Sequence, residues 1–222
     1  MTGSGSNGKW EASTVTDQVF RDLKDAGYLP ANIFHRAAEE GQVIPTPKPG
    51  ERVVFIPHFI GGLSFPLHPF VRGLMFFYGL DFHDLPPNSF MHISAFIIVC
   101  EAFLRVEPHF GLWLGIFNIK PKCVAGAHAD CGGAVISKLP RAVWPSGTFI
   151  DTIKTWQKEW FYITEPREEG RTVPAEFRSG PPTRLTSWVR KGLDWGSDTE
   201  VEDLQRGIAS LIREGVGLTN VV

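Results

Sequence analysis

Two apolar stretches near the middle of the chain decide the fold: residues 69–79 read PFVRGLMFFYG, and residues 86–104 read PPNSFMHISAFIIVCEAFL. In the first, Pro69 fits the first position of a helix and Gly79 fits its end, because proline lacks an amide hydrogen and glycine accepts a left-handed backbone. In the second, Asn88 is a preferred N-cap residue, and the apolar residues after it recur at helical spacing. We therefore predict two buried helices at the centre of the fold.

Further elements are predicted on both sides of these helices. Apolar residues at helical spacing between cap and stop residues predict more helices, and runs of β-branched and aromatic residues predict strands. We expect the last two strands to pair with each other and to lie against the helices, because two strands alone are marginal in water. The fold class is then mainly α (α+β), with a crossed helical core and a small β-hairpin or sheet packed on one side. The additional helices are predicted over residues 16–27, 108–117 and 198–215, and the strands over 53–56, 132–136 and 160–164.

The composition divides the chain into four parts. Residues 1–15 are polar and rich in glycine and predict a flexible leader, whereas residues 16–165 carry most of the predicted helices and strands. Charged residues, glycines and a proline pair predict a loop or linker over residues 166–197. The last part, residues 198–222, is predicted to form a C-terminal helix and tail.

Charge and cysteine content narrow the class of protein. The 222 residues carry 22 Lys and Arg against 24 Asp and Glu, a net charge of −2, so the chain lacks the overall basic excess that drives tight binding to duplex DNA. Three cysteines argue against a disulfide framework and favour a reducing compartment. With neither a secretory signal nor a membrane span predicted, we expect an intracellular protein, cytoplasmic or nuclear.

Three possible metal ligands lie close together in the sequence. Cys123, His128 and Cys131 have four and two residues between them, and their sulfur and nitrogen atoms suit zinc. The spacing is not that of a known zinc finger, and a fourth ligand would have to come from Asp130 or His109. We therefore predict no metal site and treat this trio as a weak candidate beside a glycine-rich loop with incidental polar residues.

A second candidate site combines aromatic and basic residues. Single-stranded nucleic-acid platforms use aromatic rings to stack bases and positive charges to bind the backbone, although a strand with one wet face gives the same pattern. This alternative would use Lys154, Trp156, Lys158, Trp160 and Tyr162.

The sequence offers no recognisable catalytic set. It contains no GxSxG, HExxH or CxxC motif, and its histidines are dispersed without an evident nucleophile. Glu101 stands in an apolar helical stretch, so we expect it to form a structural ion pair with Arg72 or Arg105. We predict that the protein is not an enzyme and needs no cofactor.

Several short strings occur in a fixed order along the central part of the chain: PHF at 57–59, HPF at 68–70, YGL at 78–80, LPPNS at 85–89 and CEAF at 100–103. In order and spacing they resemble one known family, the gypsy-type transposon domain of retroelement gag-like proteins from plants, chiefly grasses. The resemblance covers roughly residues 17–165, and it identifies the region 16–165 as such a domain.

The resemblance implies a structural role rather than a reaction. The family has no assigned catalytic residues to place on this chain, and the sequence lacks polymerase, protease and zinc-knuckle signatures. It implies a non-enzymatic, retrotransposon-derived, gag-like structural or protein-interaction protein. We expect its partner to be a second copy or another protein, with RNA or single-stranded DNA as the alternative, and we expect neither a membrane nor a small-molecule substrate.

Overall fold

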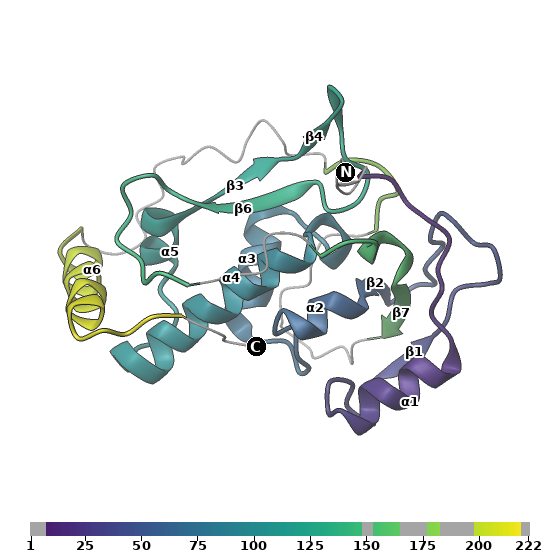
Figure 1. Ribbon diagram of the computed structural model, residues 1–222, viewed down its shortest axis with the longest axis horizontal. Helices are drawn as coiled ribbons and strands as arrows, with labels where there is room; N and C mark the ends of the chain where they lie inside the picture. The colour runs from purple at the N-terminus through teal and green to yellow at the C-terminus, as the bar shows by residue number, and fades with distance from the viewer. Residues whose placement is uncertain (1–7, 148–152, 165–176, 183–197, 219–222) are drawn as a thin grey trace.

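The structure is a computed structural model, and it describes residues 8–147, 153–164, 177–182 and 198–218 (Figure 1). The predicted loop or linker, 166–197, therefore lies outside the described residues except for 177–182. Within the described part, helices occupy the centre and both ends, and three small antiparallel sheets lie around the central ones.

The two central helices form as the sequence predicts, apart from one cap. Helix α3 (Pro69–Tyr78) ends at Gly79, which has a φ of 65°, and whose amide donates to carbonyls of the last turn. Helix α4 (Pro87–Ile98) continues into the π-helical segment η2 (Val99–Leu104). The predicted N-cap at Asn88 is wrong, because the cap is Pro86: its extended backbone places Pro87 in the first turn, where no amide hydrogen is needed.

The run Pro87–Leu104 also has the length and composition of a membrane span, the one such helix among the described residues. Half of it is buried inside the protein, as is usual for the core helix of a globular domain.

The third central helix is shorter than predicted. Helix α5 (Phe110–Ile116) starts two residues after Pro108, because His109 is its N-cap and accepts a hydrogen bond from the Leu112 amide at 3.1 Å. At Phe117 the chain turns directly into strand β3 (Phe117–Pro121). The stretch before Pro121 is therefore extended rather than helical.

The two strands predicted to pair with each other belong to different sheets. Strand β6 (Ala134–Lys138) pairs with β3, whereas β7 (Trp160–Thr164) is the middle strand between β1 (Phe34–Arg36) and β2 (Glu51–Phe55). A third pair, β4 (Cys123–Val124) and β5 (Ala127–His128), forms a short hairpin. The described residues thus confirm the α+β part of the predicted fold class, as helices with three small antiparallel sheets, whereas the mainly α character and the crossed helical core are not confirmed.

Smaller elements complete the chain. Helix α1 (Asp17–Asp25) lies inside the predicted range, and α6 (Asp198–Arg213) begins where expected. Helix α2 (Ile56–Ile60) was not predicted; it follows β2 directly, because Pro57 fits a first helical turn. Two single-turn 3-10 helices are η1 (Phe82–Asp84) and η3 (Trp156–Lys158).

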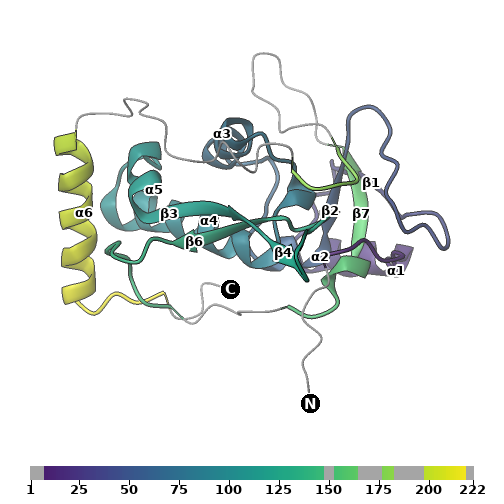
Figure 2. The same cartoon turned by 90° about the horizontal axis from the view of Figure 1, so that it is seen from above.

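Two groups of buried side chains hold these elements together. The larger one joins α1, the central helices, β3 and β6, and it reaches α6 through Ile208. The smaller one lies on the other face of the β1–β7–β2 sheet and contains Trp10, Phe55, Trp156 and Trp160. In Figure 2, α6 and α1 lie at opposite ends of the protein with the central helices between them.

The described part of the predicted leader, residues 8–15, packs against the domain. The Trp10 ring is 7% exposed and lies 5.8 Å from the ring of Phe55. The Thr14 amide donates to the Lys158 carbonyl at 2.8 Å, and the Asp130 amide donates to the Gly8 carbonyl at 2.7 Å. The Trp10 ring and these backbone hydrogen bonds together hold residues 8–15 against the domain; the rest of the leader lies outside the described residues.

Candidate functional site

Five charged side chains gather around η1, and we call them the buried charge cluster: Arg52, Asp81, His83, Asp84 and Arg178. The turn is built by its own carboxylates. Asp81 Oδ1 accepts a hydrogen bond from the Phe82 amide, and Asp84 Oδ2 accepts one from the Asp81 amide, both at 2.8 Å. This reciprocal capping fixes both carboxylates inside the protein.

His83 lies between the two carboxylates. Its Nδ1 is 3.5 Å from Asp81 Oδ2, and its Nε2 is 3.5 Å from Asp84 Oδ1. Burial alone would lower the pKa of His83, but Asp84 and Asp81 outweigh burial and raise this pKa. Burial raises the pKa of Asp84, against the opposing effects of His83 and Arg178.

The cluster joins segments that are far apart in the sequence. Arg178 Nη2 donates to Asp84 Oδ2 at 2.6 Å, and Arg52 Nη1 of strand β2 lies 3.6 Å from Asp81 Oδ2. The Phe177 ring lies 4.7 Å from the His83 ring, and Trp10 Nε1 donates to the Ser179 carbonyl at 3.0 Å. The residues 177–182 and the N-terminal segment thus cover η1.

This covering limits what the cluster can do. A general acid or base must come within hydrogen-bond reach of its substrate, yet Asp81, His83 and Asp84 are all fully buried. Removing one member of a buried ion pair is strongly destabilising. The geometry therefore suits a structural centre that joins β2, η1, the N-terminal segment and residues 177–182.

The three residues of the weak zinc candidate do not converge on one point. Cys123 and His128 face each other across the β4–β5 hairpin with 3.3 Å between Sγ and Nδ1. Cys131 is buried in the smaller core, where burial raises the pKa of its thiol to about 12. Among the described residues, no group of three or more His, Cys, Asp or Glu side chains could hold a metal ion.

The five residues of the aromatic and basic set do not share an exposed surface. Trp156, Trp160 and Tyr162 are at most 3% exposed, and only Lys154 of the set is exposed. For Trp160 and Tyr162 the physical reason is the place of β7 in the middle of its sheet, with both of its faces covered. Trp156 lies in η3, and its ring packs 4.5 Å from the ring of Phe55. In this conformation none of the three rings is open to a stacked base.

Glu101 has a different partner from the arginines expected. Its carboxylate Oε1 lies 3.0 Å from His68 Nε2, and its side chain is 49% exposed. The prediction of an ion pair with Arg72 or Arg105 is wrong, because Glu101 stands on the outer side of η2 beside His68. His68 also accepts a hydrogen bond from the Phe70 amide and so caps α3.

An exposed aromatic residue marks the edge of the three-stranded sheet. Strand β1 pairs with β7 on one side and is one of the two outer strands of that sheet in the described residues, β2 being the other. Its Phe34 side chain is 78% exposed, the most exposed large apolar side chain described. We call this strand and its exposed ring the β1 edge. Unpaired sheet edges and exposed apolar groups are typical association sites.

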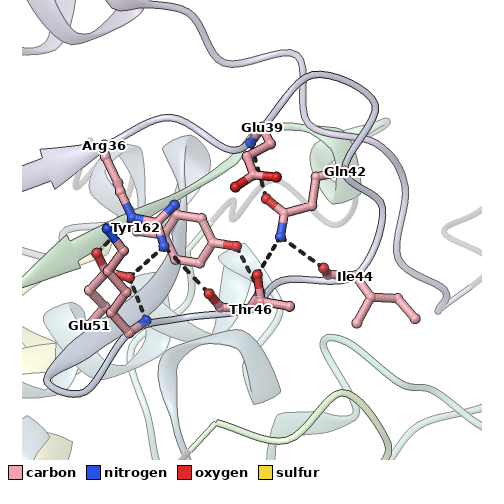
Figure 3. Close-up of polar contacts among 8 residues, drawn as sticks. Arg36, Glu39, Gln42, Ile44, Thr46, Glu51 and Tyr162 are labelled. Atoms are coloured by element: carbon pink, nitrogen blue, oxygen red, sulfur yellow. Dashed lines mark hydrogen bonds and ion pairs between the residues drawn. The ribbon is translucent and has the colours of Figure 1, made fainter.

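Polar contacts hold the β1 edge in place (Figure 3). Arg36 donates from Nε and Nη2 to both carboxylate oxygens of Glu51, at 2.7 and 2.6 Å, and its guanidinium lies 3.7 Å from the centre of the Tyr162 ring. The Tyr162 hydroxyl accepts from the Thr46 amide at 2.8 Å, and Gln42 donates to the Thr46 hydroxyl at 2.8 Å. The loop from β1 to β2 is therefore tied across the sheet.

The comparison with family models concerns the helical centre described above, from β2 to the end of β3. Residues 53–121 match the model of a family described as "Putative gypsy type transposon". No curated protein and no solved structure matches the chain. The gypsy-type segment includes Asp81, His83 and Asp84, but Phe34, Arg178 and the β4–β5 hairpin lie outside it.

Sequence reasoning missed the buried charge cluster and the β1 edge. Asp81 and Asp84 have the spacing of a capping box, which could have indicated the turn. No local signal connects this turn with Arg178, which lies 94 residues further along the chain.

Proposed function

We propose that the chain is a non-enzymatic, gag-like protein of a gypsy-type retroelement, or of a gene derived from one, and that it acts by associating with copies of itself. The match of residues 53–121 to the gypsy-type family supports the retroelement origin. The exposed Phe34 on the β1 edge is the observation that carries the assembly role.

Two further observations favour assembly over catalysis. In the buried charge cluster, Asp81, His83 and Asp84 are fully buried and the His83 ring lies against Trp10 and Phe177, so these groups hold the fold rather than meet a substrate. The bidentate Arg36–Glu51 pair keeps β1 ordered, and an ordered edge loses less conformational entropy on pairing.

The three cysteines are free thiols, which supports a reducing compartment inside the cell.

Light scattering behind a sizing column tests the proposal, with the full chain, a reducing agent and EDTA, over a wide concentration range. The mass of the parent chain is expected to grow with concentration. Phe34→Lys should raise the dissociation constant about tenfold or more, because burying a phenylalanine contributes about 1.5–3 kcal/mol.

Phe76→Lys is the matched control, because it introduces the same charge at another aromatic side chain, 57% exposed on α3. It should leave the association unchanged. A mass that stays at 24.7 kDa at every concentration would overturn the proposal. Growth of the mass only after single-stranded RNA is added would instead favour the nucleic-acid-binding alternative.

A further inference from the structure

The β4–β5 hairpin places a thiol and an imidazole side by side on an exposed surface. Cys123 and His128 are direct cross-strand partners, and both are exposed. The Ala129 amide donates to the Lys122 carbonyl at 3.0 Å, so the neighbouring Cys123–His128 pair is of the non-hydrogen-bonded type. Side chains approach most closely in such pairs, as the distance of 3.3 Å between Sγ and Nδ1 confirms.

A tight turn holds this pair. Ala125 and Gly126 have φ values of 51° and 83°, which is the pattern of a two-residue type I′ hairpin. The tip of the hairpin projects from the body of the protein in Figure 1. The Cys123–His128 pair is therefore preorganised and open to approach from outside.

The separation of the two atoms fits one metal ion. Zinc lies about 2.3 Å from a thiolate sulfur and about 2.0–2.1 Å from an imidazole nitrogen, so a gap of 3.3 Å corresponds to a ligand–metal–ligand angle of about 100°, near the tetrahedral value. The chain cannot complete such a site from its described residues. Cys131 is buried, and Asp130 Oδ2 forms an ion pair with Lys9 Nζ at 2.8 Å.

We propose that Cys123 and His128 are one half of a zinc site and that the same two residues of a second copy complete it. A structural zinc site takes four ligands, and a twofold axis through the metal would supply this pair twice, as Cys₂His₂. On binding, each Cys123 thiol gives up its proton to solvent and binds the metal as a thiolate, while His128 binds as the neutral ring. This contact is separate from the β1 edge, so either association can exist without the other.

The experiment uses the full chain under reducing conditions, at a concentration where it is monomeric in EDTA. Zinc is added, and mass and metal content are measured together. The expected result is a doubled mass with one zinc per two chains, reversed by EDTA. Cobalt(II) in place of zinc should give the thiolate-to-metal absorption band of a tetrahedral site.

Cys123→Ser and His128→Gln should each abolish the doubling and the cobalt band. Ala127→Ser is the matched control, because it changes an exposed residue of the same hairpin that is not a ligand, and it should behave as the parent chain. The proposal is overturned by no zinc uptake, by one zinc per chain at unchanged mass, or by an equal response in Cys123→Ser. A doubled mass that EDTA does not reverse would also overturn it, because the chain is monomeric in EDTA at this concentration.

Discussion

His58 shows how far burial can shift the pKa of a single side chain. It is fully buried on α2, where its Nε2 lies 3.0 Å from the Leu85 carbonyl and its Nδ1 lies 3.4 Å from the Phe55 amide. The neutral ring with its proton on Nε2 satisfies both contacts, as donor to Leu85 and acceptor from Phe55. Burial lowers the pKa of His58 to about 3, because the charged ring would lose its hydration.

This shift predicts a loss of stability in acid. The pKa of His58 falls from 6.5 in the unfolded chain to about 3 in the folded protein, so the unfolded chain takes up the proton first. The contribution of His58 is therefore present above about pH 6.5 and is lost as the pH falls toward 3, with a slope of up to about 1.4 kcal/mol per pH unit. Urea unfolding between pH 7.5 and 5 measures how the free energy of unfolding changes with pH.

The reference is His58→Gln, because other groups titrate in the same range. The raised pKa of His83 acts in the opposite sense: its contribution is complete below the unfolded pKa and is lost as the pH rises. The difference between the parent chain and His58→Gln cancels such effects. If both unfold with the same pH slope, His58 does not titrate as argued.

At the scale of elements, the contact between α2 and α4 depends on a glycine. Gly62 follows α2 with a φ of +98°, and a Cβ added there would lie 2.8 Å from the Cβ of Ser94 on α4. Ser94 cannot move away freely, because its hydroxyl donates to the Gly61 carbonyl at 3.2 Å. Only glycine combines this backbone conformation with so close an approach.

We expect Gly62→Ala to lower the free energy of unfolding by about 2–4 kcal/mol, from backbone strain and overpacking together. Gly41→Ala separates the two causes. Gly41 has a φ of +73°, but an added Cβ would meet no described heavy atom within 4 Å, so only the backbone cost of about 1 kcal/mol is expected. Denaturant midpoints of both variants measure the difference, and equal losses would refute the packing argument.

The two central helices of this protein could be predicted from the sequence, but the pairing of its strands could not. The central helices α3 and α4 were predictable because their periodicity is long and their flanking residues are specific, and the errors at Asn88 and Pro108 concern only the first turn. Strand pairing was not predictable, because β7 pairs with β1 and β2, more than 100 residues earlier in the chain.

The candidate sites also differ in whether local sequence or long-range strand pairing determines them. The cross-strand meeting of Cys123 and His128 follows from a local turn, so their closeness in the sequence was informative. The burial of Trp160 and Tyr162 follows from the middle position of β7, which the alternation of aromatic and basic residues does not reveal.

At the scale of the whole molecule, the packing of α6 determines whether the C-terminal helix unfolds cooperatively with the rest of the protein. It packs against α5 and η2, at the end of the protein opposite α1 (Figure 2). Ile208 is fully buried in the larger core, whereas Ile212, one helical turn later, is 37% exposed. A Cβ added at Gly207 would lie 2.9 Å from Leu104 Cδ2, so the helix fits closely against η2.

This packing predicts that α6 unfolds together with the rest of the protein. Ile208→Ala should lower the free energy of unfolding by about 2–5 kcal/mol, because it leaves a cavity in the shared core, and Ile212→Ala should have a much smaller effect. Tryptophan fluorescence reports on the seven tryptophans, none of which lies in α6 and of which Trp113 and Trp160 are fully buried, while far-ultraviolet circular dichroism reports on all helices. Both signals should shift to the same lower midpoint in Ile208→Ala. A helical signal lost before the fluorescence changes would mean that α6 unfolds as a separate unit, because the environment of the buried tryptophans would then not change when α6 unfolds.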